Sequence, residues 1–60
     1  MMTMFHAYRD GEALVVSEDG VTFEVPGELL SVAGLRELRT GQRLVLDLDT
    51  AGAAIAVRLP

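Results

Sequence analysis

The sequence contains no cysteine, no lysine and no tryptophan, and its aromatic residues are two phenylalanines and one tyrosine. Without cysteine, no disulfide and no thiolate metal site can stabilise the fold. This absence fits a reducing compartment, so we expect a cytoplasmic protein. No hydrophobic run approaches the roughly 20 residues that a membrane helix requires, and the N-terminus lacks the basic start and apolar stretch of a signal peptide. We therefore expect no membrane partner.

Basic residues are also scarce. Nine acidic residues and five basic ones give a formal net charge of −4, and all five basic residues are arginines. Tight binding to nucleic acid depends on clustered cationic contacts with phosphates, so this balance argues against it. Arg36, Arg39 and Arg43 lie close together in the sequence, and the simplest interpretation is that they keep a turn and a strand edge in water.

Half of the 60 residues are hydrophobic. A chain this short buries only about 60% of the surface that its unfolded form exposes, so most apolar side chains must enter one core. Turn residues with glycine recur at short spacing, which is typical of an all-β sandwich or barrel. We expect one domain over residues 1–60, with strands at residues 3–8, 12–16, 21–25, 42–49 and 53–59.

The last two expected strands alternate between apolar and other residues, as half-buried strands do. This pattern predicts six core side chains, namely Leu44, Leu46, Leu48, Ile55, Val57 and Leu59. Between the third and fourth strands, leucines recur at near-helical spacing, and Gly34 interrupts them. We therefore expect one short helical turn on each side of Gly34. Three strands, a longer connection and two strands give the order of a five-stranded antiparallel OB-type barrel.

Residues that could support catalysis or bind a metal are few. His6 is the only histidine, and no carboxylates stand at a ligand spacing from it. The serines and threonines have no convincing general base. Asp47 and Asp49 could together bind a hard cation, but a solvated strand face is the simpler interpretation. No glycine-rich phosphate loop precedes a helix. We predict no catalytic residue, no metal site and no cofactor, and therefore no enzyme.

The stretch from residue 11 to residue 59 resembles the bacterial cold-shock domain. That family has a second strand of the form KGFGFI, an acidic-glycine turn, a third strand of the form DVFVHF, and a later GF-x-x-L-x-x-GQ-x-V pattern. The corresponding stretches here are DGEALVV, SEDG, VTFEVPG and GLRELRTGQRLVLDLD, followed by AAIAVRL. The clearest match is Gly34-Leu35, followed by Leu38 and Gly41-Gln42. The resemblance implies a small barrel that binds single-stranded nucleic acid by stacking bases on surface aromatic rings.

The family's stacking positions are mostly altered in this sequence. Its first-strand tryptophan corresponds to Phe5, which is still aromatic, and its motif lysine corresponds to Asp10. The other aromatic and histidine positions correspond to Glu12, Leu14, Glu24, Pro26, Gly27 and Leu35. Stacking is worth about 1–3 kcal/mol per base, so the loss of three or more stacks removes roughly 3–9 kcal/mol. The family's usual mode of binding should therefore be severely weakened.

Two hypotheses follow for the function. In the first, the altered face contacts protein, either a second copy or a larger complex, through Phe5, Tyr8, Glu12, Leu14 and Glu24. Leu14 should point outward with Glu12, because Ala13 and Val15 share the inward parity. In the alternative, the chain still binds single-stranded RNA or DNA weakly, through Phe5, His6, Tyr8, Arg36, Arg39 and Arg43.

Overall fold

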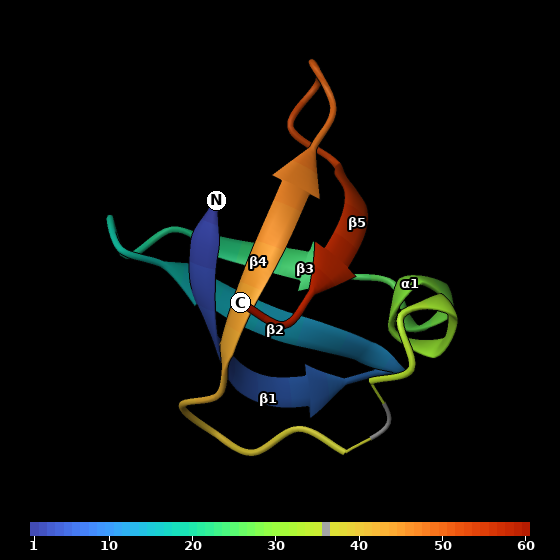
Figure 1. Cartoon of the computed structure of the whole chain (residues 1–60). Helices are drawn as coiled ribbons and strands as arrows, with labels where there is room; N and C mark the ends of the chain where they lie inside the picture. The colour runs from blue at the N-terminus through green and yellow to red at the C-terminus, as the bar shows by residue number, and fades with distance from the viewer. Residues whose placement is uncertain (36) are drawn as a thin grey trace.

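The computed structural model describes residues 1–35 and 37–60. It contains five strands and one short helix (Figure 1). The elements in chain order are β1 (Met2–Arg9), β2 (Glu12–Ser17), β3 (Thr22–Val25), α1 (Gly27–Val32), β4 (Arg43–Leu48) and β5 (Ala54–Arg58). The predicted strands are confirmed, and no strand end differs from the expected one by more than one residue. No helix in the described part of the chain is long and apolar enough to cross a lipid bilayer.

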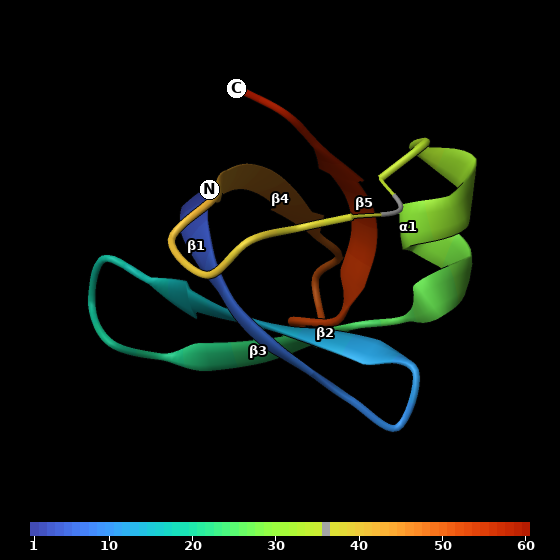
Figure 2. The same ribbon diagram turned by 90° about the horizontal axis from the view of Figure 1, so that it is seen from below.

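All neighbouring strands are antiparallel, and they form one sheet in the order β3-β2-β1-β4-β5. The sheet curves round a common interior, with α1 at one side (Figure 2). The two edge strands, β3 and β5, come into contact, but no ladder of hydrogen bonds joins them among the described residues. The mostly β fold with five antiparallel strands is thus confirmed, while the strand pairing itself leaves the sheet open.

The β1–β2 hairpin shows how local sequence sets a turn. Arg9 pairs with Glu12, so Asp10 and Gly11 form a two-residue loop. Both loop residues have positive φ, 51° for Asp10 and 80° for Gly11. Positive φ at both central positions defines a type I′ turn, whose twist matches that of the flanking strands. Asp-Gly is among the pairs that tolerate this conformation best, so this hairpin is fixed by its sequence.

Helix α1 ends in a Schellman motif. Gly34 has φ of 74°, its amide donates to the Ser31 carbonyl, and the Leu35 amide donates to the Leu30 carbonyl at 2.9 Å. Glycine is favoured at this position because it adopts left-handed φ without steric cost. The helical turn expected before Gly34 is confirmed. The turn expected after it is wrong for the described residues 37–39, which are not helical, because the motif redirects the chain away from the helix axis.

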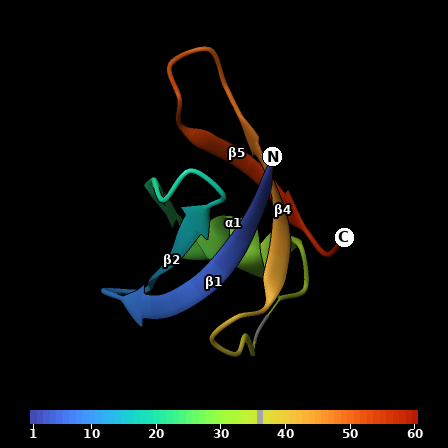
Figure 3. The same cartoon turned by 90° about the vertical axis from the view of Figure 1, so that its left-hand side faces the viewer.

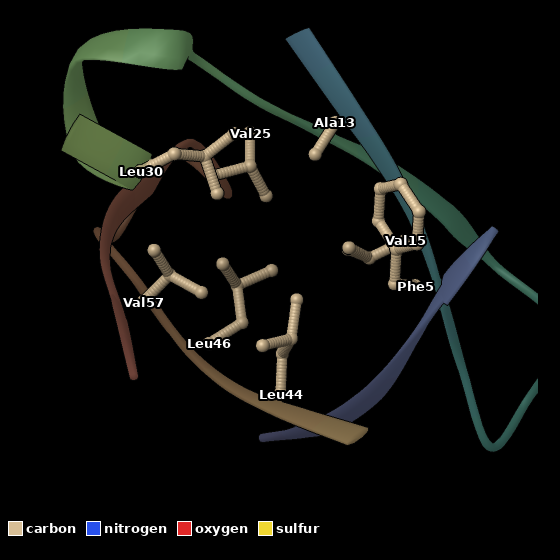
Figure 4. Packing of buried hydrophobic residues seen from close by; sticks show 8 residues of the cluster. All are labelled: Phe5, Ala13, Val15, Val25, Leu30, Leu44, Leu46 and Val57. Atoms are coloured by element: carbon tan, nitrogen blue, oxygen red, sulfur yellow. The ribbon is translucent and has the colours of Figure 1, made fainter. Parts of the chain in front are cut away.

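The core contains eight buried hydrophobic side chains that point toward one another inside the curved sheet (Figure 4). They are Phe5, Ala13, Val15, Val25, Leu30, Leu44, Leu46 and Val57. The buried Thr3 lies beside them, and its hydroxyl donates to the Leu44 carbonyl at 2.9 Å. Every strand and the helix contribute to this cluster, so the elements depend on one another for stability.

Two of the six predicted core residues are placed wrongly by the sequence pattern. Leu44, Leu46 and Val57 are buried, and Leu48 packs against the cluster. Ile55 is 54% exposed and Leu59 is 51% exposed. Asp47 pairs with Ala56 and Leu48 with Ala54, so Ile55 is an extra residue in a β-bulge and points outward. Leu59 follows the last residue of β5, and no strand pairing orients it toward the core.

Gly27 lies against the β1–β2 hairpin. A β-carbon at this position would come within 2.6 Å of the Gly11 carbonyl oxygen, which belongs to the backbone and has little room to move. We expect Gly27→Ala to lower the free energy of unfolding by about 1–2 kcal/mol, because overpacking exceeds the gain in helix propensity. Urea denaturation should detect this, with Ser31→Ala in the same helix as the control. An unchanged midpoint in Gly27→Ala would show that the hairpin can move away.

Candidate functional site

A bulge in β1 decides where the aromatic side chains point. Phe5 pairs with Val15 and Ala7 with Leu14, so His6 is left without a partner across the β1–β2 ladder. A bulged residue shifts the alternation of side chains by one position. Phe5 and Tyr8, three residues apart, therefore lie on the same side of the sheet, and their ring centroids are 4.8 Å apart.

Phe5 belongs to the core and not to an exposed surface. It is only 3% exposed, which corrects the expectation that it forms part of a binding surface. The physical reason is its register, since Phe5 lies opposite Val15, which is itself fully buried. The backbone of Phe5 is also held by two hydrogen bonds, from its amide to the Gln42 carbonyl and from the Gly41 amide to its own carbonyl.

The other two aromatic rings are also engaged on the inner side. Tyr8 packs against Phe5 at an interplanar angle of 57°, and its hydroxyl accepts a hydrogen bond from the Leu38 amide. Phe23 lies opposite Val15 and packs against the core. None of the aromatic side chains that the structure describes therefore lies on the side of β2 and β3 that faces away from the core.

We call that side of the sheet, facing away from the core, the outer face. On β2 it carries Glu12, Leu14 and Val16, since Ala13 and Val15 are fully buried. This confirms the predicted parity of the strand. Leu14 pairs with Glu24 on β3 and is half-buried. Three of the predicted surface residues, Glu12, Leu14 and Glu24, thus lie together, whereas Phe5 and Tyr8 belong to the opposite side.

An ion pair borders Leu14. The guanidinium of Arg9 donates to a carboxylate oxygen of Glu24 at 2.6 Å. The two side chains are 62% and 51% exposed, so solvent screens the pair and its contribution to stability is at most about 1 kcal/mol. Its effect on the surface is to offset one of the two acidic charges beside Leu14.

Glu12 is the second acidic residue at this place. Partial burial raises the pKa of the Glu12 carboxyl above its ordinary value, and a side-chain hydrogen bond with Glu24 and repulsion from Glu24 raise it further. The positive charge of Arg9 opposes this shift. The ionised form of Glu12 is therefore less favourable here than in water, and any contact that brings a cation to Glu12 would be favoured.

This arrangement predicts a measurable effect on the titration of Glu12. In Glu24→Gln, the pKa of Glu12 should fall toward its ordinary value, because repulsion from Glu24 is removed while the effect of burial stays. A raised pKa in the folded state stabilises the protein below the pKa of the unfolded chain, and this stabilisation is lost as the pH rises through the folded pKa. NMR titration of the side-chain carboxyl carbon measures the shift directly. Glu18→Gln, at the other end of β2, is the control, and an equal shift there would contradict the assignment.

An apolar band continues from Leu14 across the sheet. Met4 pairs with Val16 on β2, and Met2 pairs with Val45 on β4. Met4 is 46% exposed, and the other side chains of the band are half-buried. A shallow hollow of about 110 Å³ lies beside Met2, Met4 and Val16. Figure 3 shows β1, which carries both methionines, between β2 and β4.

Two arginines lie beyond the apolar band. Arg43 is directly opposite Met4 and borders the hollow, and Arg58 is directly opposite Val45. Both are exposed. Sequence reasoning did not find Met2, Met4 or Arg58, because they join Leu14 only through the pairing of strands that are distant in the chain. The alternation of Met2, Thr3 and Met4 was the one local signal for the two methionines.

The residues of the nucleic-acid hypothesis are divided between two places. Thr40 donates from its hydroxyl to the His6 carbonyl at 3.0 Å, and the Leu38 amide donates to Tyr8. The segment that contains Arg39 therefore lies along His6 and Tyr8. Phe5 is in the core, Arg43 is on the outer face beside Met4, and Arg36 lies outside the described residues.

The aspartates considered as a cation site have a simpler role. One carboxylate oxygen of Asp49 accepts hydrogen bonds from the amides of Ala51 and Ala53, each at 2.9 Å. Asp49 thereby closes the turn between β4 and β5, as Asp and Asn side chains commonly do. Within residues 1–35 and 37–60, no group of three or more histidine, aspartate or glutamate side chains is placed to hold a metal ion.

Comparisons of this chain with family models, with curated proteins and with solved structures found no match. The functional argument therefore depends on the geometry of the outer face. That geometry places Leu14 and the apolar band between Glu12 and Glu24 on β2 and β3 and Arg43, Asp47 and Arg58 on β4 and β5.

Proposed function

We propose that the chain is a non-enzymatic binding module with a partly open OB-type barrel, similar to the cold-shock domain, and that its outer face contacts protein. The strand order β3-β2-β1-β4-β5 supports this fold, as does the contact between the edge strands β3 and β5. The position of α1 between β3 and β4 also fits such a barrel.

The observation that carries the proposal is the composition of the outer face. Its apolar band is bordered by Glu12 and Glu24 on β2 and β3, and by the charged side chains of Arg43, Asp47 and Arg58 on β4 and β5. An apolar centre with a charged rim is typical of a protein-contact surface. The aromatic side chains that the structure describes lie on the other side of the sheet. The outer face therefore offers no aromatic ring on which a base could stack.

The cold-shock resemblance supports the same interpretation. Glu12, Leu14 and Glu24 stand at positions where that family has stacking rings, and all three are on the outer face. Two of them are acidic and would repel phosphates. A face that has lost its rings but keeps an apolar centre suits a protein surface better than a single-stranded nucleic acid.

Binding to a pyrimidine-rich single strand should be weaker than about 10 μM at moderate salt, because the stacking contributions of about 1–3 kcal/mol per base are missing. Fluorescence anisotropy with a labelled oligonucleotide measures this. Tyr8→Ala and Arg39→Ala are the informative variants, since both side chains are exposed and outside the core. Nanomolar affinity that either variant abolishes would overturn the proposal.

One observation favours the alternative function. The packing of the Arg39 segment along His6 and Tyr8 groups an exposed ring, an imidazole and a guanidinium at one end of β1. Such a group could hold one base and one phosphate. If the titration shows salt-sensitive micromolar binding that Tyr8→Ala weakens, weak binding of single-stranded nucleic acid becomes the better description.

Leu14→Arg tests the protein-contact function. The side chain is on the outer face and half-buried, so the variant should remain folded by circular dichroism. The tagged wild-type chain should retain a protein from cell extract or associate with itself, and Leu14→Arg should do neither. Val32→Arg, on α1 at a side chain that is 88% exposed, is the matched control and should behave as the wild type. A monomeric wild type that retains no protein would overturn the proposal.

A further inference from the structure

We infer that an extended peptide segment with alternating basic and apolar residues binds along the free edge of β3 as an added antiparallel strand. Main-chain hydrogen bonds to Thr22 and Glu24 hold the segment, and its basic side chains lie on the outer face. This inference rests on the proposed function and names the partner. It places the partner beside Leu14, which is directly opposite Glu24.

The hairpin of β2 and β3 shows which main-chain groups of β3 are free. The Ser17 amide donates to the Val21 carbonyl at 2.9 Å, and hydrogen-bonded pairs recur at every second residue of an antiparallel ladder. Phe23 therefore directs its amide and carbonyl toward β2. The amides and carbonyls of Thr22 and Glu24 point the other way, where the sheet order of the described residues gives β3 no neighbouring strand.

The hydrogen bonds of β1 give the same assignment. The Phe5 amide donates to the carbonyl of Gln42, just before β4, at 2.7 Å, so Phe5 directs its main-chain groups toward β4. Met4 then directs its groups toward β2, where it lies opposite Val16. Because Val16 bonds to β1, it forms no main-chain bond with Thr22, its partner position on β3. Two separate sets of hydrogen bonds thus assign Thr22 to the free edge.

This edge is accessible over a short length. Thr22 and Glu24 are exposed, and Val21, just before β3, is 50% exposed. Strand β5 approaches β3, but no ladder joins the two among the described residues. Pro26 follows β3 and has no amide proton to donate. The edge that can receive a strand therefore runs from residue 21 to residue 24.

The charge around the edge selects a basic partner. Residues 9–28 contain six acidic residues and one arginine, a formal charge of −5, whereas the rest of the chain contains three acidic residues and four arginines, a formal charge of +1. The six acidic residues are Asp10, Glu12, Glu18, Asp19, Glu24 and Glu28. They lie on β2, on β3, in the loops at the two ends of β2 and in the first turn of α1. A cationic segment is attracted to this edge, and the equally acidic edge of a second copy is repelled.

The two sides of β3 select different side chains. In an antiparallel strand, the residues opposite Thr22 and Glu24 point to the outer face, and the residue opposite Phe23 points to the inner side. Phe23 is half-buried and packs against the core, so an apolar residue opposite it would cover its ring. The segment that fits best has one apolar residue between two basic ones.

The outer face beside this edge has room for a further cation. Arg9 donates to one carboxylate oxygen of Glu24, and no salt bridge to Glu12 is found among the described residues. Desolvation and the nearby Glu24 raise the pKa of the Glu12 carboxyl. A basic side chain placed between the two glutamates should lower this pKa, because it offsets their mutual repulsion.

A synthetic pentapeptide, GRVRG with both ends blocked, is the probe for the whole chain. In an NMR titration, the amide signals of Thr22 and Glu24 should shift and saturate. We expect a dissociation constant of about 0.1 mM, because the contact is far smaller than a standard interface. The pKa of Glu12 should fall when the probe is bound. The acidic counterpart GEVEG is the control and should not bind.

Two variants at one position separate the main-chain contact from the charge. Glu24→Pro and Glu24→Gln both lose the carboxylate that pairs with Arg9, but only proline also removes the outward amide proton. That proton is not part of the ladder with β2, so Glu24→Pro should remain folded, as proline does on edge strands. Its affinity for the probe should be lower than that of Glu24→Gln by about tenfold, the effect of one lost hydrogen bond.

A modified probe makes the same test on the unaltered protein. N-methylation of both arginines in GRVRG removes the donors that face β3 and keeps the charges. This probe should not bind. Equal binding of the methylated and unmethylated probes would show that no strand is added, whether or not Glu24→Pro folds.

The outcomes separate this inference from the proposed function. Unchanged Thr22 and Glu24 signals at about 1 mM probe, or equal affinity for GEVEG, would overturn it, and the acidic charges would then serve only to keep the edge from pairing. If the wild-type chain still retains a protein that Leu14→Arg loses, the proposed function stands without strand addition.

Discussion

Phe5→Ala should unfold most of the protein. Truncating a buried phenylalanine costs about 3–5 kcal/mol, and Phe5 is 3% exposed with its ring against Tyr8 and the core. At about 0.05–0.15 kcal/mol per residue, a domain of 60 residues has a total stability of roughly 3–9 kcal/mol. The loss is therefore comparable with the whole stability of the fold.

Thermal unfolding followed by circular dichroism measures this effect. Met4→Ala, at the adjacent and 46% exposed position, is the control and should change the unfolding free energy by less than about 1 kcal/mol. A Phe5→Ala protein with the wild-type Tm would show that the core assignment is wrong. Because Phe5 supports the fold, any loss of binding in Phe5→Ala reports unfolding, and Tyr8→Ala is the variant that tests an aromatic contact.

The second large effect is expected at Leu46. Its side chain is 1% exposed, lies opposite Val57 and points into the centre of the core (Figure 4). Removing a buried leucine side chain costs about 2–5 kcal/mol, depending on how far the surroundings collapse into the cavity. The sheet is curved and backed by one helix only, so few neighbours can move in, and we expect a value in the upper half of that range.

Urea denaturation distinguishes a loss of native-state stability from a change in the unfolded state. In Leu46→Ala the midpoint should fall strongly while the slope of the transition stays as in the wild type, which indicates lost stability without a change in the unfolded state. Asp47→Ala, at the next position of β4 and facing outward, should shift the free energy of unfolding by only about 0.5 kcal/mol. Equal effects at the two positions would contradict the inward orientation of Leu46.

These two variants also bear on the interaction surface. Phe5 and Leu46 lie on the inner side of the strands that carry Met4 and Val45 on their outer side. Loss of the core would therefore remove the outer face as well. Tests of binding and dimerisation should use outer-face variants, such as Leu14→Arg, whose folding has been verified independently.

Much of the fold could be predicted from local sequence. The Asp10-Gly11 pair fixes a two-residue hairpin through its positive φ values. Gly34 ends α1 because it adopts left-handed φ at the C-terminal cap. The alternation of Leu44 and Leu46 with outward residues sets the face of β4. In each case the physical cause acts over a few residues, so the pattern is sufficient.

Part of the candidate site was also predictable. The parity of β2 placed Leu14 and Glu12 on the outer face, and β3 brings Glu24 beside Leu14 through a short hairpin. The prediction was correct here because β2 and β3 pair without a bulge. Whether this face binds a protein stays a prediction.

The sequence by itself determined the five strands, their turns and the inward side of β2 and β4. Only the tertiary structure decided the bulges at His6 and Ile55, which move Phe5 into the core and Ile55 out of it. A shift of one residue turns every following side chain to the other face, and the cost of a bulge depends on how two distant strands fit together. The pairing of β1 with β4, which joins Met4 to Arg43, is equally non-local. Val16, Met4 and Arg43 become neighbours on the outer side of the sheet only through these pairings of strands.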